Sequence, residues 1–142
     1  MNIIIFGASG KTGHELVKQA LAQGHFVTAF VRNPSKLKIT HPNLKVIQGD
    51  IVNYQIVEEA VKEQDAVLSA LGAASPLKFD QSVVVGMANI IKAMEAKGVT
   101  RLIYMSAILV KETRNNAGFV IRYIAPKLLF TSNTFTPITF TK

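Results

Sequence analysis

Hydrophobic and polar positions follow two alternating patterns along most of the chain. Short continuous apolar runs, rich in β-branched and aromatic residues, are typical of parallel strands buried on both faces. Between these runs the apolar residues recur at helical spacing. In residues 11–23, Leu16, Val17 and Ala20 share one face, and Gly24 follows as a stop signal. The pattern therefore predicts strands that alternate with helices.

The predicted elements can be placed along the chain. Strands are expected at residues 2–6, 26–31, 44–47, 66–70 and 101–105. Helices are expected at residues 11–23, 54–62 and 80–97, with another at 119–130 that Pro126 makes irregular. Strand–helix–strand repetition implies parallel strands joined by right-handed crossovers. We therefore expect an α/β fold with a three-layer, doubly wound parallel sheet (a Rossmann fold) in the strand order 3-2-1-4-5.

The length of 142 residues suits one domain with a substantial core, which we place at residues 1–130. Residues 131–142 (TSNTFTPITFTK) break the alternation, because they combine five threonines with Pro137. They predict neither a regular element nor a separate domain.

Composition excludes several kinds of site. The chain has no cysteine, so disulfides and thiolate metal sites are ruled out. His14, His25 and His41 lack metal-ligand spacing, and no metal is expected. The sequence has neither the pattern of a signal peptide nor an apolar stretch long enough to span a bilayer. We therefore expect a cytoplasmic protein without a membrane partner.

The net charge of +7 favours an anionic ligand, and its distribution is informative. Residues 16–49 contain no acid. The basic residues of this span are Lys18, Arg32, Lys36, Lys38 and Lys45. Such a cluster fits a phosphate-bearing ligand, a nucleic acid or an ordinary solvated face. Nucleic acid is not an expected partner, since neither a helix-turn-helix nor a basic strand with interleaved aromatics stands out.

A glycine-rich loop, residues 7–13 (GASGKTG), joins the first strand to the first helix. Gly7 permits the sharp turn, Gly10 lets the backbone approach a pyrophosphate, and Gly13 lets the helix pack closely on the strand. The helix N-terminus presents free N–H groups and a partial positive charge to the phosphates. The side-chain donors of the loop are Ser9, Lys11 and Thr12. The loop predicts a dinucleotide site.

The loop also partly matches the phosphate-binding motif GxxxxGK[ST] of nucleotide hydrolases, through Gly10-Lys11-Thr12. That motif needs a glycine at position 5, where this chain has Ile5 inside a strand. Asp65 precedes its strand instead of ending it, so it is misplaced for binding Mg²⁺. Nucleotide hydrolysis is therefore disfavoured.

The end of the second strand indicates which dinucleotide is bound. An acid there holds the ribose 2′-OH of NAD, whereas an arginine accommodates the 2′-phosphate of NADP. This chain has Arg32 at that point, with Lys36 shortly after, and both suit a phosphate. NADP(H) is therefore expected in preference to NAD(H), and the alternative is a solvated arginine.

Further candidate contacts follow the third and fourth strands. Asp50 is placed to accept a hydrogen bond from the adenine amino group, with Ile51 against the ring. Leu71 and Gly72 would pass close to the ribose and diphosphate. Asp50 and Gly72 fit ordinary turns as well.

Together these segments resemble the atypical short-chain dehydrogenase/reductases that bind NAD(P)H, in particular the NmrA-like and biliverdin-IXβ reductase (flavin reductase)-like group. The resemblance covers about residues 1–130. It rests on GASGKTG at 7–13, VRNPSKL at 31–37, QGDI at 48–51, DAVLSALG at 65–72 and VVVGMANIIKAMEAKGVTRLIYMSA at 83–107.

The resemblance implies that the glycine loop binds the pyrophosphate, that Arg32 and Lys36 bind the 2′-phosphate, and that Asp50 and Ile51 contact the adenine. It also implies that Ser106 lies near the nicotinamide. Members of the group continue with an Asp-His-containing helix, a strand and a proline-bearing loop. Residues 131–142 match none of these, so the chain looks like a member truncated at its C-terminus.

Three residues are candidates for catalysis. In such enzymes the cofactor carries the hydride, while the protein orients the substrate and supplies a proton. Ser106 is suited to hydrogen-bond a carbonyl or the nicotinamide amide, or simply to satisfy local backbone groups. Tyr123 and Lys127 have the YxxxK spacing of the acid–base pair in many short-chain dehydrogenases. Pro126 lies between them, and a plain packing helix is the alternative.

These observations predict an NADPH-dependent oxidoreductase that reduces a small carbonyl, flavin or tetrapyrrole-like substrate. The expected partner is a small molecule, and a monomer is favoured. Two alternatives stay open. One is a non-catalytic NADP(H)-binding redox sensor, and the other is a truncated, inactive form.

Overall fold

The computed structural model describes residues 1–72 and 80–105, and these residues contain a five-stranded parallel sheet. The strands are β1 (Asn2–Phe6), β2 (Phe26–Val31), β3 (Leu44–Gln48), β4 (Ala66–Ser69) and β5 (Leu102–Tyr104). Their order in the sheet is β3-β2-β1-β4-β5, and all pairings are parallel. The predicted fold class and strand order are confirmed.

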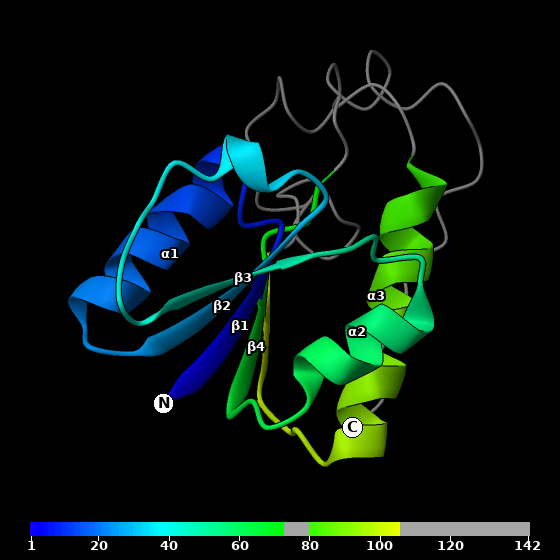
Figure 1. Cartoon of the computed structure of the whole chain (residues 1–142). Helices are drawn as coiled ribbons and strands as arrows, with labels where there is room; N and C mark the ends of the chain where they lie inside the picture. Colours follow the sequence, from blue (N-terminus) through cyan, green and yellow to red (C-terminus); the bar gives the residue numbers. More distant parts are fainter. Residues whose placement is uncertain (73–79, 106–142) are drawn as a thin grey trace, which may run out of the picture. The chain divides into compact units, whose positions relative to one another are not determined.

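Helices cover both faces of the sheet and so complete the three layers (Figure 1). The helices are α1 (Lys11–Ala22), α2 (Tyr54–Val61) and α3 (Gln81–Lys97), and a short 3-10 helix, η1 (Pro34–Lys36), follows β2. α1 lies on one face, whereas α2 and α3 lie together on the other. The predicted boundaries agree with these elements to within one residue. The predicted helix at 119–130 and the tail at 131–142 lie outside the described residues.

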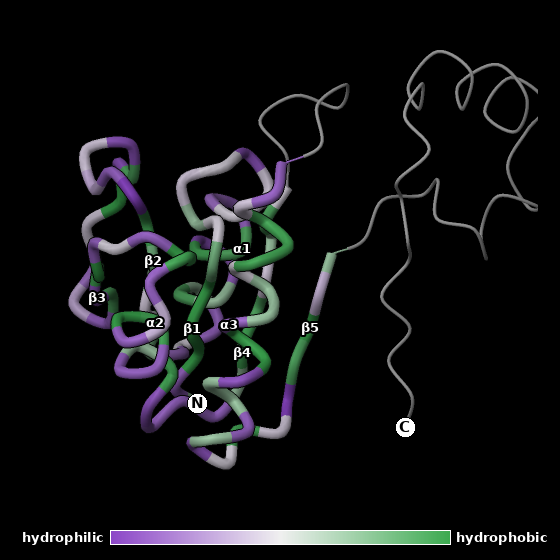
Figure 2. Tube along the Cα trace, turned by 90° about the vertical axis from the view of Figure 1, so that its right-hand side faces the viewer, coloured by the Kyte–Doolittle hydropathy of each residue, from purple (hydrophilic) through white to green (hydrophobic). Residues whose placement is uncertain are grey.

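The central strand β1 shows why the strands are continuous apolar runs. Ile3 and Ile5 pack into the cluster beneath α1, while Ile4 and Phe6 pack into the cluster beneath α2 and α3. Successive side chains of a strand point to opposite faces, so a strand covered on both faces needs apolar residues at every position. Accordingly, the trace of β1 is mostly hydrophobic, whereas the edge strand β3 is mixed (Figure 2).

α2 and α3 contact each other as well as the sheet. The Lys97 ammonium lies 3.2 Å from the Glu58 carboxylate. The Lys92 ammonium lies over the Tyr54 ring, 4.4 Å from its centroid. Both contacts join α3 to residues of α2 and so fix the two helices side by side.

Candidate functional site

The carboxyl ends of the strands meet at one edge of the sheet. Phe6, at the end of β1, is in register with Phe30 of β2 and with Ser69 of β4. Val31 is likewise in register with Gln48 of β3. The loops that begin at residues 7, 32, 49 and 70 therefore leave the sheet side by side. The strand order reverses at β1, and ligands of doubly wound sheets bind at such a point.

Gly7 makes the turn at the end of β1 and has a positive φ of 76°. A Cβ on this residue would lie 2.7 Å from the carbonyl oxygen of Ala70, which follows β4. The N–H of Ala70 in turn donates to the carbonyl oxygen of Phe6 over 3.0 Å. The loop after β1 thus runs against the loop after β4, and only glycine fits at the contact. The sharp turn predicted at Gly7 is confirmed, and its contact with a pyrophosphate stays a prediction.

Gly13 lies in the first turn of α1 and is buried. A Cβ there would lie 2.1 Å from the carbonyl oxygen of Gly7 and 2.8 Å from the Cα of Ala8. Close packing therefore requires glycine here, and the backbone that it meets belongs to the loop after β1, whereas the prediction placed the contact on the strand. Gly10 differs, because a Cβ there would meet just the Gly7 oxygen, at 3.3 Å. Gly10 leaves the approach to the helix terminus open without being required by packing.

The N-terminus of α1 is open to a ligand. Gly10 is its N-cap, and no side chain of the described residues caps the helix. The first N–H groups of a helix have no partner within it, so those of Lys11, Thr12 and Gly13 are available. The first turn has no acidic residue, and Ser9, Lys11 and Thr12 are exposed. This arrangement suits a pyrophosphate.

Arg32 and Lys36 follow β2 at the same edge, and both are exposed. The Asn33 side chain accepts a hydrogen bond from the N–H of Ser35 over 3.0 Å and so caps η1. The capped turn begins just after Arg32 and ends at Lys36. The backbone oxygen of Arg32 accepts a hydrogen bond from the Gln48 amide, which ties the residue to β3. Two cations thus stand where the second strand ends.

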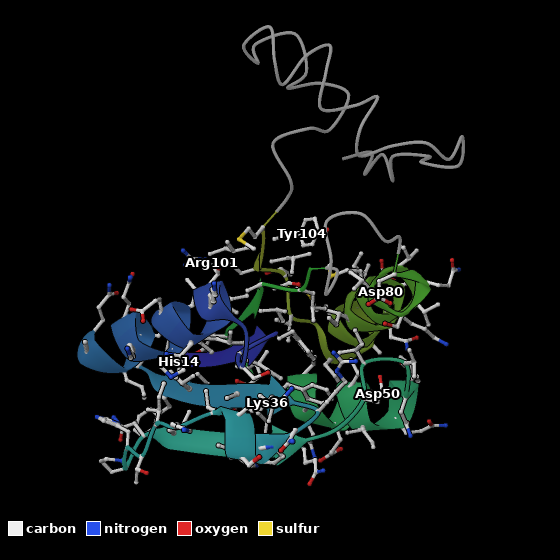
Figure 3. The ribbon with its side chains drawn as sticks, turned by 90° about the horizontal axis from the view of Figure 1, so that it is seen from above. His14, Lys36, Asp50, Asp80, Arg101 and Tyr104 are labelled. Carbon is white, nitrogen blue, oxygen red and sulfur yellow. The ribbon has the colours of Figure 1, made fainter. Side chains whose placement is uncertain are left out.

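Asp80, the N-cap of α3, also faces this region. Its side chain accepts hydrogen bonds from the hydroxyl and the N–H of Ser82. These bonds, and then the positive charge of Arg32, hold the pKa of the Asp80 carboxyl below its ordinary value. Figure 3 views the sheet from above and shows Lys36, Asp50 and Asp80 in succession from η1 to the start of α3.

The turn after β3 contains both predicted adenine contacts. Asp50 is exposed, and one of its carboxylate oxygens accepts a hydrogen bond from the N–H of Val52 over 3.1 Å. This is the ordinary turn geometry foreseen as the alternative, and it leaves the second oxygen for a ligand. The Ile51 side chain is 8% exposed and packs beneath α3. A ring bound here would therefore meet the backbone of Ile51 more than its side chain.

Leu71 and Gly72 follow β4, beside the glycine loop. Leu71 is half-buried against the α2/α3 cluster, and Gly72 is exposed. Their contact with a cofactor stays a prediction, as do the contacts assigned to the other site residues. The catalytic candidates Ser106, Tyr123 and Lys127 lie outside the described residues.

Sequence reasoning missed three residues that the fold brings to this site, namely Asp80, Gly86 and Asn89. Asp80 reaches it from the start of α3, while Gly86 and Asn89 contact the turn after β3. Gly86 carries a signal in the sequence, because a glycine inside a helix costs about 1 kcal/mol relative to alanine and implies close packing there. The contact made by Asn89 has no such signal.

Residues 1–72 and 80–105 lack two kinds of feature. They contain no group of three side chains suited to hold a metal ion. None of their helices is long and apolar enough to cross a membrane.

The fold and the glycine loop together define a dinucleotide-binding protein of the Rossmann type. The model of the NAD(P)H-binding family matches residues 7–129 of the chain. The chain belongs to this family. The matched region begins at the glycine that turns the backbone off β1.

The chain is similar to enzymes that are considerably longer. It is 35% identical to 2-alkyl-3-oxoalkanoate reductase of Stenotrophomonas maltophilia, over 75% of this chain and 33% of that enzyme. It is 34% identical to 3 beta-hydroxysteroid dehydrogenase/Delta 5-->4-isomerase of Mycobacterium tuberculosis, over 74% of this chain and 31% of that enzyme. The chain thus spans about a third of the length of these relatives.

A solved structure supports the same assignment. The Rossmann-fold NAD(P)-binding family protein of Shigella flexneri superposes with a TM-score of 0.63 at 28% identity, over 78% of this chain and 54% of that protein. The residues of this chain fit such a cofactor, because the start of α1 is uncapped and Gly10 leaves room for a phosphate.

Proposed function

We propose that the chain is the cofactor-binding part of an NADPH-dependent reductase and that it prefers NADPH to NADH. The observation that carries the preference is the exposed pair Arg32 and Lys36 at the carboxyl end of β2. A carboxylate at that point would bind the ribose 2′-OH of NAD, and this chain has a guanidinium instead. Arginine offers forked donors that match a phosphate.

The surrounding charges favour the same ligand. Residues 16–49 contain no acid, so the approach to Arg32 from β2, η1 and β3 is free of repulsion. Asp80, at the start of α3, is an acid whose pKa is lowered in part by the charge of Arg32. The backbone N–H groups at the start of α1 would bind the pyrophosphate, while Arg32 and Lys36 would bind the 2′-phosphate.

A bound nicotinamide would supply hydride to the substrate. The described residues bind and orient the dinucleotide: the start of α1 holds its phosphates and the end of β2 its ribose phosphate. The similar proteins named as a reductase and a dehydrogenase favour a small carbonyl substrate. The resemblance to the biliverdin-IXβ reductase-like group adds flavins and tetrapyrrole-like compounds to the proposed substrates. Membership of that group is itself part of the proposal.

The preference is tested by titrating the purified chain with NADPH and with NADH, following cofactor fluorescence and thermal unfolding together. At about 100 times its Kd, a ligand that binds the native state alone stabilises by about 2.7 kcal/mol. We expect Arg32→Asp to weaken NADPH binding by about 30-fold or more, since hydrogen bonds to charged groups contribute about 1.5–3 kcal/mol each. NADH binding should change much less.

Arg101→Asp is the matched control. Arg101 is exposed and precedes β5, so it lies at the opposite, amino end of the strands. The variant makes the same charge change away from the site and should bind NADPH like the wild type. An equal loss of NADPH affinity in both variants would mean that net charge, and not the site, explains the effect. Equal affinity of the wild type for NADPH and NADH would contradict the preference.

A turnover screen then separates a reductase from a redox sensor. NADPH oxidation is followed with small ketones, flavins and a tetrapyrrole such as biliverdin. Oxidation with one class identifies the substrate. Tight NADPH binding without oxidation across all of them would instead favour a protein that senses the cofactor.

A further inference from the structure

α3 holds the turn between β3 and α2 by a close packing contact at Gly86. A Cβ on Gly86 would lie 2.4 Å from the Cδ1 and 2.8 Å from the Cβ of Ile51. The Ile51 side chain therefore fills the space that the missing side chain leaves on α3. Both residues are buried, and Ile51 belongs to the core cluster under α2 and α3.

Asn89 adds a polar contact to the same turn, one helical turn further along α3. Its amide nitrogen donates to the carbonyl oxygen of Ile51 over 2.9 Å and to that of Val52 over 3.1 Å. The side chain is half-buried. An amide has two N–H donors on one nitrogen, so it can satisfy two adjacent carbonyl groups. A carboxylate of the same shape accepts hydrogen bonds and would repel them.

The carbonyl groups that Asn89 holds belong to the turn that presents Asp50. The Asp50 carboxylate accepts from the N–H of Val52, and its backbone oxygen accepts from the N–H of Asn53 over 3.0 Å. Asn53 then caps α2 through its side chain. The position of the Asp50 carboxylate at the sheet edge is thus coupled to two carbonyl groups fixed from α3.

We propose that Asn89 is a positioning residue for the adenine half of the dinucleotide. It acts through the turn at residues 50–53: with both carbonyl groups held, the free oxygen of Asp50 and the backbone of Ile51 stay where the adenine binds. This inference rests on the proposed function. It adds a residue of α3 that would control affinity without touching the cofactor.

The test compares Asn89→Asp and Asn89→Leu with the wild type. Asn89→Asp keeps the shape and removes both donors, and Asn89→Leu removes them without adding charge. The Kd values of NADPH and of 2′,5′-ADP, which lacks the nicotinamide half, are measured by calorimetry at a temperature at which each variant is folded by circular dichroism. We expect both ligands to bind about 10-fold more weakly to both variants, since each variant loses the two hydrogen bonds that hold the turn.

Lys92→Met is the matched control on the same helix. It removes the contact of α3 with the Tyr54 ring and leaves the turn at residues 50–53 untouched. Its Kd values should equal those of the wild type even if its thermal stability falls. The comparison thus distinguishes loosening of the α2–α3 contact from loosening of the turn.

Wild-type affinity in Asn89→Leu, with or without a loss of stability, would overturn the inference while leaving the proposed function intact. A loss in Asn89→Asp alone would also overturn it, because added charge would then explain the effect. Absence of NADPH binding by the folded wild type would refute the proposed function, and the inference with it.

Discussion

Replacing Gly13 by alanine would add one methyl group at the closest contact between α1 and the loop after β1. The new Cβ would lie 2.1 Å from the Gly7 oxygen and 2.7 Å from the Gly7 carbonyl carbon. Ordinary contact begins at 3.4 Å, so the shortest distance falls short by about 1.3 Å. Both opposing atoms are backbone, and Gly7 is held by its own contact with Ala70. The strain cannot be relieved by rotation of a side chain.

Relief must come from a movement of α1 away from the sheet. That movement opens the contacts of Val17, Ala20 and Leu21, which are buried on the inner face of the helix. Overpacking of a close-packed site typically costs about 1–3 kcal/mol and occasionally more. The higher helix propensity of alanine relative to glycine offsets at most about 1 kcal/mol of this cost. Since the 2.1 Å contact places the cost at the upper end of this range, we expect a net loss of about 2 kcal/mol, an appreciable share of a stability of about 5–15 kcal/mol.

The assay is equilibrium unfolding in urea, followed by circular dichroism, with thermal unfolding alongside. The midpoint temperature should fall by about 6 °C, given about 2–4 °C per kcal/mol for a chain near this size. The slope of the urea transition should be unchanged, because the surface exposed on unfolding is the same. A Gly13→Ala variant as stable as the wild type would refute the argument that this contact requires glycine.

Two further predictions concern neighbouring positions. Gly10→Ala should keep the fold, at a cost of no more than about 1 kcal/mol, since its Cβ meets a single atom at 3.3 Å. It should nevertheless weaken NADPH binding, measured by fluorescence titration, because the methyl group stands at the uncapped start of α1; undiminished affinity would contradict that. At Asp80 the folded-state pKa is lowered by Ser82 and Arg32, so the carboxylate stabilises the fold above about pH 4 and loses this effect as the pH falls through the lowered pKa. The stability difference between wild type and Asp80→Asn, measured in urea from pH 7 to 3, should therefore shrink on acidification, and a pH-independent difference would disprove the charge interaction.

The elements of the sheet could be predicted from the sequence because each is encoded locally. The run Asn2–Phe6 is apolar at successive positions, and that pattern already implies two covered faces. The stop at Gly98 is equally local, since its φ of 70° is one that glycine adopts readily. Alternation of strands and helices then leaves few topologies, so the strand order followed from the handedness of the crossovers.

The glycine loop could be predicted for the same reason, because it too is encoded locally. Gly7, Gly10 and Gly13 lie within seven consecutive residues, and their spacing alone predicts a separate role for each. The structure separates these roles: packing requires glycine at Gly7 and Gly13 but not at Gly10, whose predicted role toward a ligand stays a prediction. Arg32 was found because its place at the end of β2 is fixed by the strand itself.

The contacts around the turn at residues 50–53 depend on the tertiary structure. Ile51 was expected beside the adenine from its place in the chain, yet its side chain fills the space above Gly86, far along the sequence. Asn89 donates a hydrogen bond to Ile51, which lies 38 residues earlier in the chain. The charge of Arg32, which follows β2, lowers the pKa of Asp80, which precedes α3. Local pattern determines which faces an element buries, but the partner of each polar group is set by which elements the fold packs together. The sequence by itself thus determined the sheet and the glycine loop, while the packing of α3 against the turn after β3 decided how that turn is held.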